Sequence, residues 1–448
     1  MKPKTVEQQR AVLKQLATES GSVSGQPARQ LQEVGRVSQT EHTIETFHER
    51  QKIVRSENRK VFGLTHLAGQ SSLASLRRVN GQVIQVINMA SYNYLGLGAH
   101  QAVIAAAKDA LDTYGLGACA SPTLAGTLQV HEDLAGDLMA FYGFNEQEYD
   151  VALFSSGFGT LMGSVSALVQ KGDVVFLDQY SHASIVDGAR MSEARVVYFR
   201  HNDMGHLESL LKEYARAGVR SLICTEGVFS ADGDTARLVE LVALARQYGA
   251  QTLVDEAHSA LISGATGRGE CEAQGVLNDV DFIALTFSKS FSGVGGALIG
   301  HRKYVEYIGF HARCRVFSCA MDPAVTAGVR QSLAIAASAE GDLRRQRLQD
   351  NARYFRSKLE GRVELLGEGW VVPVVFGDEA IVNALANEFH TQGLDASPML
   401  FPGVPRKRAR MRMFVTADHT REQLDRAADI ILTLAGRFGF SSDSAESA

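Results

Sequence analysis

The 448-residue sequence contains few cysteines, and they follow no recognisable spacing. They are odd in number, are scattered along the chain and include no Cys-X-X-Cys pair; the five are Cys119, Cys224, Cys271, Cys314 and Cys319. This distribution argues against both a disulfide framework and a zinc site. We therefore expect no metal site, and a reducing cytoplasm fits the cysteine usage best.

The sequence also lacks long hydrophobic runs and blocks of basic residues. No uninterrupted apolar run approaches the ~20 residues of a membrane-spanning helix, and the N-terminus shows no apolar signal-peptide region. The formal net charge is -5 and the basic residues form no block that could supply the phosphate contacts of nucleic-acid binding. With 45% hydrophobic and 21% charged residues, the composition is typical of a soluble globular protein. We expect no membrane span, no nucleic-acid partner and a cytoplasmic location.

The length predicts more than one structural unit, because single cores stop growing at about 250 to 300 residues. Residues 1–60 are polar and helix-prone, with a flexible break at 20–27, and we interpret them as an N-terminal arm. Residues 61–335 are expected to form a large domain and residues 336–440 a smaller C-terminal α+β domain. Residues 441–448 are expected to be a solvated tail.

Short apolar runs alternate with helical patterns between residues 100 and 300. The runs lie at 151–154, 174–177, 196–199, 221–224, 252–254, 282–285 and 297–299. Continuous apolar runs separated by helices are typical of a sheet buried on both faces. The sequence therefore predicts an α/β fold with a mostly parallel sheet, in which ligands bind at the carboxyl ends of the strands. Similar patterns predict a strand at 82–88 and C-terminal helices and strands at 343–359, 371–376, 378–391, 411–415 and 421–438.

One lysine follows the predicted strand 282–285 in an unusual setting. Lys289 lies among small hydroxyl residues, in the stretch 286–296 that ends in a glycine cluster. Desolvation lowers the pKa of a lysine amine and makes it a better nucleophile and base, as the Schiff-base lysine of an aldehyde cofactor requires. Taken alone, however, the stretch is explained more simply by an exposed loop lysine.

Polar groups at other predicted strand ends suit pyridoxal phosphate (PLP). Asp255 could pair with a protonated pyridine nitrogen, and His258 could hydrogen-bond a phenolic oxygen. The turn 155–160 joins a strand to a helix, and its amides could bind a phosphate. His182 could stack on a flat ring, and the segment 225–230 offers hydroxyl groups. Each has an ordinary structural alternative: a solvated acid that caps a helix, a turn without a ligand, or a surface histidine.

Five motifs in chain order resemble those of the α-oxoamine synthases, a PLP-dependent family with the aspartate aminotransferase fold (fold type I). The motifs are Ser156-Gly157-Phe158, Ser181-His182-Ala183-Ser184, residues 226–234, Asp255-Glu256-Ala257-His258 and Thr286-Phe287-Ser288-Lys289. The residues 91–96 are most similar to the serine palmitoyltransferase version of their motif. The resemblance implies PLP as the cofactor, a large PLP-binding domain with a smaller C-terminal domain, and a homodimer with shared active sites.

The resemblance also implies roles for individual residues. Lys289 would be the Schiff-base lysine and general base, Asp255 the partner of the pyridine nitrogen, and His182 a catalytic group stacked on the ring. The resemblance further implies contacts with the cofactor phosphate, made by Ser156, Gly157, Phe158, Thr286 and the partner-facing Ser318. Ser230 and His258 would contact the phenolic oxygen of the cofactor. Arg412 would bind the substrate carboxylate, and Tyr92 and Asn93 would also contact substrate.

The implied reaction joins a small amino acid to an acyl thioester with loss of CO2 and gives an α-amino ketone. The sequence does not choose among alanine, serine and glycine, nor between acyl-CoA and acyl carrier protein as donor. Relatives usually carry an arginine where this chain has Pro122, near the acyl-donor entrance, and this departure leaves room for the carrier protein. Two other classes are kept as alternatives: a PLP-dependent aminotransferase or lyase, and a catalytically silent scaffold subunit, against which Lys289 argues.

Overall fold

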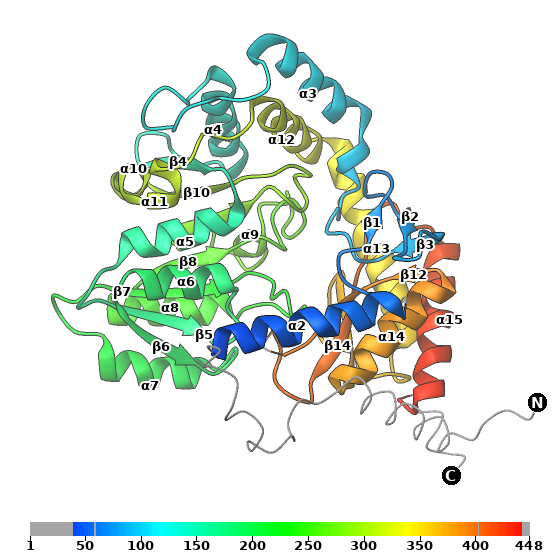
Figure 1. Ribbon diagram of the computed structural model, residues 1–448. Helices are drawn as coiled ribbons and strands as arrows, with labels where there is room; N and C mark the ends of the chain where they lie inside the picture. The colour runs from blue at the N-terminus through cyan, green and yellow to red at the C-terminus, as the bar shows by residue number, and fades with distance from the viewer. Residues whose placement is uncertain (1–38, 58–59, 402, 441–448) are drawn as a thin grey trace, which may run out of the picture.

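The computed structural model of the protein describes residues 39–57, 60–401 and 403–440 (Figure 1). Of the predicted N-terminal arm it describes helix α2, Gln39–Ser56, and the segment before residue 39 lies outside the described residues. The predicted tail, 441–448, lies outside them as well. The interpretations of the arm before α2 and of the tail therefore stay predictions.

A seven-stranded sheet forms the centre of the larger part of the chain. Its strands are β4 Tyr149–Phe154, β5 Val174–Asp178, β6 Arg195–Phe199, β7 Ser221–Glu226, β8 Gln251–Asp255, β9 Phe282–Thr286 and β10 Gly296–His301. They lie in the order β4-β10-β9-β8-β7-β5-β6. β10 is antiparallel to both of its neighbours, and the remaining neighbouring pairs are parallel. The predicted mostly parallel sheet is confirmed, with one strand for each of the seven apolar runs.

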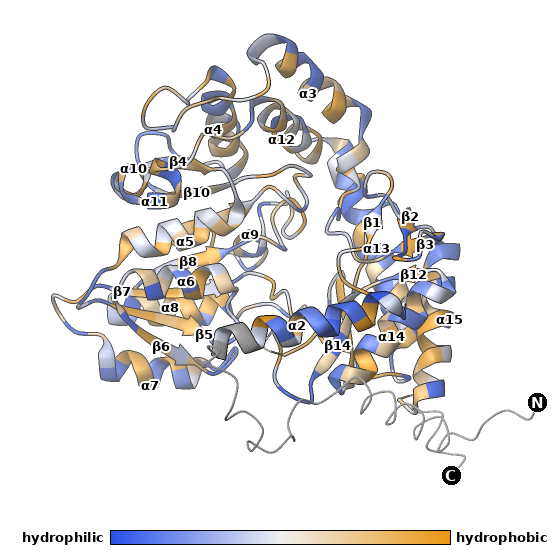
Figure 2. Cartoon of the chain, viewed as in Figure 1, coloured by the Kyte–Doolittle hydropathy of each residue, from blue (hydrophilic) through white to orange (hydrophobic). Residues whose placement is uncertain are grey.

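Helices cover both faces of this sheet. The helices α5 (Gly157–Leu168), α6 (Ala183–Met191) and α10 (Arg302–His311) share one hydrophobic cluster with the strands, and α7 (Met204–Tyr214) and α8 (Leu238–Tyr248) share another. Successive residues of β5 divide between the clusters: Val175 and Leu177 belong to the first, Val174 and Phe176 to the second. Burial on both faces explains the continuous apolar runs, whose hydrophobic colour is visible along these strands in Figure 2.

A second group of helices packs beside β4 and β10. It consists of α3 (Gln101–Tyr114), α4 (Gln129–Tyr142) and α12 (Pro323–Ala336), with α12 packed against both of the others. The remaining short elements are η1 (Leu97–Ala99), α9 (Glu270–Ala273) and α11 (Arg313–Val316). Within the described residues, no helix combines the length and the apolar character needed to cross a membrane.

The C-terminal region contains a three-stranded sheet and three helices. β14 (Ala409–Phe414) lies between β11 (Val371–Gly377) and β13 (Ser397–Met399) and is antiparallel to both. The helices are α13 (Ala339–Leu359), α14 (Glu379–Gln392) and α15 (Arg421–Phe438). The predicted helices and strands between 343 and 438 are confirmed, and the predicted helix 421–438 coincides with α15.

A four-stranded sheet combines three strands from the N-terminal part of the described chain with one strand from its C-terminal region. Its strands are β1 (Thr65–His66), β2 (Leu73–Arg77), β3 (Val83–Asn88) and β12 (Leu394–Asp395), in that order. β12 is parallel to β3, with Leu394 opposite Ile87. The predicted strand at 82–88 is confirmed. Segments of both predicted domains thus meet in one sheet, and the domain boundaries at 60, 335 and 440 stay predictions.

A buried histidine before α15 should make the fold sensitive to mild acid. Burial lowers the pKa of His419 from 6.5 to about 4, although its hydrogen bonds to the backbone oppose the decrease. Between these values the unfolded chain binds a proton that the folded chain does not, so stability falls as the pH falls. From pH 6.5 to pH 5, we expect wild type to lose about 1.5 kcal/mol of unfolding free energy that His419→Gln does not lose.

Urea unfolding of both proteins at several pH values measures this difference. His48→Gln, which replaces an exposed histidine of α2, is the matched control and should follow wild type. Parallel pH profiles for wild type and His419→Gln would contradict the prediction.

Candidate active site

The carboxyl ends of three adjacent strands bring the central polar residues together. Because β7, β8 and β9 are parallel neighbours, Glu226 lies opposite Asp255, and Asp255 lies opposite Ala284. Thr286 ends β9, and Lys289 follows three residues later. The strand order alone therefore places two acids and the lysine at one edge of the sheet.

Lys289 lies half-buried in the connection between β9 and β10. Its Nζ is 5.7 Å from the centroid of the Tyr92 ring. Burial and the Arg412 guanidinium lower the pKa of Lys289. The carboxylates of Asp255 and Glu226 oppose this decrease without cancelling it. A lowered pKa increases the fraction of neutral amine that can act as a nucleophile or base.

The segment after Lys289 folds back on the end of β9. The backbone N–H of Phe287 donates to the carbonyl of Gly295 at 2.9 Å. The hydroxyl of Ser292, a residue with φ 58°, donates to Oδ1 of Asn93 at 3.0 Å. These contacts fix the backbone around the lysine. The amide oxygen of Asn93 thus has a structural partner, and the predicted contact of this residue with substrate stays a prediction.

The turn between β4 and α5 lies beside the end of β9. Ser156 is the N-cap of α5, and its Oγ accepts from the backbone N–H of Gly159 at 3.0 Å. A Cβ atom on Gly157 would lie 2.2 Å from Oγ1 of Thr286, so the close approach of these two segments requires glycine. The first amides of α5 and the Thr286 hydroxyl therefore meet at one place, and the exposed Phe158 follows directly. Such a helix N-terminus is suited to a phosphate.

Asp255 and Glu226 are both buried, and burial raises the pKa of each carboxyl group. Burial raises the pKa of Asp255, and the positive charges of Lys289 and His182 oppose the increase. Burial and the neighbouring Asp255 raise the pKa of Glu226 to about 8. One of two adjacent acids can therefore stay ionised near neutral pH while the other holds a proton.

His258 is held neutral in an aromatic environment. The Tyr94 hydroxyl contacts its Nδ1 at 2.7 Å, and Nε1 of Trp370 donates to its carbonyl at 3.1 Å. Burial lowers the pKa of His258 well below its ordinary value, and the charge of Lys289 lowers it further. With Nδ1 engaged by Tyr94, Nε2 is the ring atom available to a cofactor.

Sequence reasoning assigned no role to three of these residues: Trp370, and Glu226 and Tyr94, which lie within the motifs 226–234 and 91–96. The apolar run 221–224 ended the predicted strand two residues before Glu226, whereas β7 includes it. Tyr94 and Trp370 meet His258 from 164 and 112 residues away, and no local pattern signals such contacts. Only the Tyr-X-Tyr spacing of residues 92–94 could have drawn attention to Tyr94.

His182 is the N-cap of α6 and is exposed. It lies within the influence of the charges of Asp255 and Lys289. Its Nδ1 accepts from the backbone N–H of Ser184 at 3.3 Å and contacts the Ser184 hydroxyl at 2.7 Å. Its ring centroid lies 6.3 Å from that of Phe158. Partial desolvation lowers the pKa of His182, Asp255 opposes the decrease, and Lys289 adds to it. The capping contacts fix which nitrogen can point away from the helix.

Arg412 reaches the site from the C-terminal sheet. On β14 it lies opposite Pro373 of β11 and Ser397 of β13. Its Nη1 donates to the carbonyl of Ser230 at 2.7 Å, and its guanidinium carbon is 5.1 Å from the centroid of Phe414. The side chain is buried, and its Nε has no hydrogen-bond partner among the described residues. A buried guanidinium with an unpartnered donor is suited to a carboxylate.

The other predicted site residues differ in how closely they approach this group. Tyr92 packs against Phe414 at 4.6 Å and His258 at 5.9 Å between ring centroids. Ser230 meets Arg412 through its backbone carbonyl. Ser318 lies between α11 and α12 and, within the described residues, shares no hydrogen bond or ion pair with the rest of the site. The roles assigned to these and the other site residues stay predictions.

The residues present fit PLP on independent grounds. The turn at Gly157 leaves space that a Cβ atom would fill, at the N-terminus of α5. The buried Asp255 and the neutral His258 offer a carboxylate and an imidazole for opposite parts of a substituted pyridine ring. Lys289 supplies an amine with a lowered pKa in the same charged environment.

Comparisons with known proteins show which families this chain resembles. Residues 84–431 match the family described as aminotransferase class I and II. Serine palmitoyltransferase of Sphingomonas wittichii has a TM-score of 0.83 and 32% identity, covering 90% of this chain and 99% of that one. A serine palmitoyltransferase solved with PLP has a TM-score of 0.83 and 31% identity, covering 90% of this chain and all of the other. The 8-amino-7-oxononanoate synthase of Thermoanaerobacter pseudethanolicus is 39% identical over 345 residues, 77% of this chain and 86% of the relative.

The fold and the matches define a PLP-dependent enzyme of fold type I. More particularly, the chain belongs to the α-oxoamine synthase family and is a PLP-dependent C-acyltransferase. The predicted family, fold type, cofactor and enzyme class are confirmed. These findings favour the synthase over the aminotransferase or lyase, and over the silent scaffold subunit, that the sequence had kept as alternatives.

Replacing Lys289 should remove the covalent attachment of PLP and leave the fold intact. We expect Lys289→Ala to lose covalent PLP, detected as the absence of a PLP-modified peptide after borohydride reduction. Turnover should fall by about 100- to 10,000-fold, because a positioned base contributes a factor of this size. The exposed Lys303→Ala is the matched control and should keep both properties. A reduced PLP adduct on another lysine of wild type would contradict the assignment.

Proposed function

We propose that the protein joins a small amino acid, alanine, serine or glycine, to an acyl thioester with loss of CO2. A C–C bond forms between the amino-acid Cα and the acyl carbon, and the C–S bond of the thioester breaks. The bond from Cα to the carboxylate carbon also breaks as CO2 leaves, and a proton takes its place on Cα. The products are an α-amino ketone, CO2 and the free thiol. The observation that carries this proposal is the buried Arg412 guanidinium with its unpartnered Nε, in the same charged environment as Lys289.

The names of the relatives support the two halves of this reaction. The curated relative is named for an amino-oxononanoate product, and the solved neighbours are named for serine and a palmitoyl group. An amino acid and an acyl group are thus the expected components here. The identity of both stays open, because relatives with different substrates are similar to this chain to a comparable degree.

Each polar residue of the site has a proposed task. Bound PLP supplies an electron sink for the charge that develops at the amino-acid Cα. Arg412 would hold the amino-acid carboxylate with its planar donor fork. Lys289, whose pKa is lowered, would remove the proton from Cα. Asp255 would keep the proton on the pyridine nitrogen, and neutral Glu226 would add no second negative charge beside it.

His182 is proposed to act on the acyl group. Because its Nδ1 is engaged by Ser184, the ring would direct Nε2 toward the acyl oxygen. A donor held at that oxygen stabilises the negative charge that forms when the carbonyl is attacked. Its exposed position suits a residue that must be reached by the second substrate.

A cavity beside the site bears on the acyl carrier. It has a volume of about 360 Å³, and Pro122 lines it together with Ser155 and Cys319. Of the residues that line it, Arg302 pairs with Asp150. The second lining arginine, Arg315, donates to backbone carbonyls. Both arginines that line the cavity therefore already have hydrogen-bond or ion-pair partners. This favours a carrier-bound donor over coenzyme A, which has additional phosphates to bind.

The remaining partner assignments belong to the same proposal. We propose a homodimer in which Ser318 approaches the phosphate of the partner subunit, and a cytoplasmic location. Asp255, Glu226 and Arg412, which shift the pKa of Lys289, belong to the same chain as the lysine, and Ser318 is the residue proposed to reach the partner.

A matrix of amino acids against acyl donors tests the reaction. We expect thiol and CO2 to appear together with a product whose mass equals the sum of the substrates minus thiol and CO2. If Pro122 marks a carrier-protein entrance, carrier-bound donors will be used and free CoA thioesters of the same chain length will not. An aldehyde or keto-acid product would refute the synthase, and efficient turnover of free CoA thioesters would refute only the role of Pro122.

Arg412→Lys should weaken amino-acid binding selectively. A lysine keeps the positive charge but loses the bidentate fork, so we expect the amino-acid KM to rise about 10- to 100-fold, as for loss of one charge-assisted hydrogen bond. The thioester KM should change little. Arg408→Lys is the matched control, because Arg408 is half-exposed and pairs with Glu364. Equal changes in both KM values would count against the proposed contact.

A further inference from the structure

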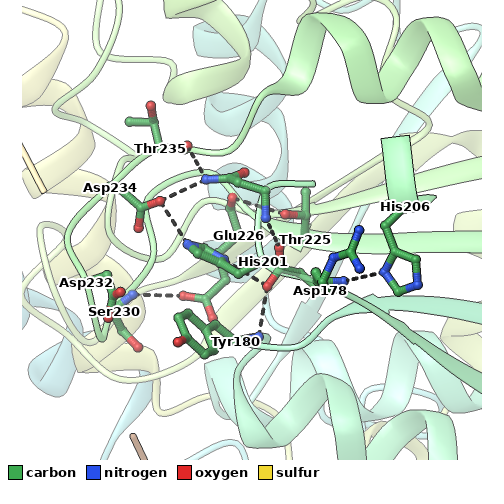
Figure 3. Close-up of polar contacts among 12 residues, drawn as sticks. Asp178, Tyr180, His201, His206, Thr225, Glu226, Ser230, Asp232, Asp234 and Thr235 are labelled. Carbon is green, nitrogen blue, oxygen red and sulfur yellow. Dashed lines mark hydrogen bonds and ion pairs between the residues drawn. The ribbon is translucent and has the colours of Figure 1, made fainter. Parts of the chain in front are cut away.

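His201 lies between two carboxylates at the edge of the site (Figure 3). Its Nδ1 is 3.0 Å from Oδ1 of Asp178, and its Nε2 is 2.9 Å from Oδ2 of Asp234. Its ring stacks on Tyr180, at 4.4 Å between centroids, and meets the edge of Phe229 at 4.5 Å. Asp178 ends β5, whereas Asp234 belongs to the loop between β7 and α8. The histidine therefore connects two segments that share no strand.

The contacts of His201 require a charged ring. Each nitrogen faces a carboxylate oxygen, so both nitrogens must donate. Asp178 also accepts from the backbone N–H groups of Tyr180 and Asn202, and Asp234 accepts from the Asn202 side chain. Burial lowers the pKa of His201, but the hydrogen bonds and charges of both carboxylates raise it to about 10. His201 is thus an imidazolium throughout the pH range in which enzymes are usually assayed.

The loop that His201 holds, residues 227–235, also contacts the substrate arginine. Within it, Ser230 donates its backbone N–H to Glu226 at 3.1 Å and accepts from Arg412 at 2.7 Å through its carbonyl. Asp232 forms an ion pair with the fully buried Arg410. The loop thus connects the end of β5, through His201, with two arginines of β14.

The charges around His201 show why a neutral side chain would not serve there. Asp178 is buried and Asp234 is only partly exposed, and both are acceptors of the same ring. Without the cation, two carboxylates would face each other across a partly desolvated gap, and their repulsion would drive the loop away from β5. Tyr180, which stacks on the ring, is itself influenced by the charges of Asp232, Arg410 and Arg408. Glu226 is influenced by the charge of Asp178.

We propose that His201 is a positioning residue for amino-acid binding: its imidazolium clamps the loop 227–235 against the end of β5, so that the Ser230 carbonyl holds the Arg412 guanidinium in place. This inference rests on the proposed carboxylate contact of Arg412. His201 itself touches neither cofactor nor substrate, and it acts through the loop.

The test uses holoenzyme variants and follows amino-acid binding without the acyl donor. The dissociation constant is read from the change in the cofactor absorption spectrum on addition of amino acid. His201→Gln can donate to only one carboxylate, and we expect about ten-fold weaker amino-acid binding, with the thioester KM within about two-fold of wild type. His206→Gln, at the next histidine of the same segment, is the matched control, because the His206 ring accepts from the backbone N–H of Arg200 and, among the described residues, makes no hydrogen bond with Asp178 or Asp234.

A second substitution distinguishes the clamp from general structural damage. Removing the opposing charge in His201→Gln/Asp234→Asn should restore most of the affinity, whereas Asp234→Asn alone should weaken it, because the two effects are coupled. Wild-type affinity in His201→Gln would overturn the proposal, as would failure of the double variant to recover. If His201→Gln does not fold, Asp234→Asn alone decides: unchanged amino-acid affinity would overturn the clamp.

Hydrogen exchange of the holoenzyme in the absence of both substrates gives a readout independent of activity. Peptides that cover residues 227–235 should exchange faster in His201→Gln than in wild type or His206→Gln, and unchanged exchange would overturn the clamp. The amino-acid dissociation constant of Arg412→Lys is measured in parallel. Normal amino-acid affinity in Arg412→Lys would refute the proposed function of that arginine, while a normal His201→Gln beside a weakened Arg412→Lys would refute only the positioning role.

Discussion

Burial of the Lys289 amine beside two carboxylates sets conditions that the surrounding chain has to meet. An amine must lose much of its proton affinity to act as a base, yet Asp255 and Glu226, at the ends of adjacent strands, both favour its charged form. The structure reconciles these demands by burying all three groups together. Burial lowers the pKa of the lysine and raises that of Glu226 to about 8, so the acid nearest to Asp255 contributes little negative charge.

The arrangement follows directly from the parallel pairing of the strands. Strands β7, β8 and β9 end at the same edge, so residues distant in sequence become neighbours without a dedicated loop. The same edge receives the N-terminus of α5, and the contact of Gly157 with Thr286 shows how tightly the two segments approach. A side chain larger than glycine at position 157 would separate the turn between β4 and α5 from the strand that leads to Lys289.

The fold was largely predictable from the sequence because its signals are local. Four inner strands of the large sheet, β5, β7, β8 and β9, are almost entirely buried and therefore read as continuous apolar runs. α15 reads as an amphipathic helix between a Thr cap and a glycine. The strand-end residues Asp255 and Lys289 were predictable for the same reason. Glu226, His201 and Trp370 were not, because their importance comes from partners far away in the chain. The proposed contact of Ser318 lies beyond one chain and cannot be read from it.

Arg412, the proposed substrate arginine, shows why such long-range contacts matter. Arg412 lies on β14, in a sheet that shares no strand with the large one, so its position relative to Lys289 has to be fixed by other contacts. The loop 227–235 makes several of them: Ser230 and Asp232 hold Arg412 and Arg410, and a Cβ atom on Gly233 would lie 2.5 Å from the carbonyl of Val371 on β11. A loop anchored at one end only would transmit its fluctuations to the guanidinium. The His201 ring contacts both Asp178 at the end of β5 and Asp234 in the loop, so the proposed carboxylate site would be positioned by the large sheet as well as by β14.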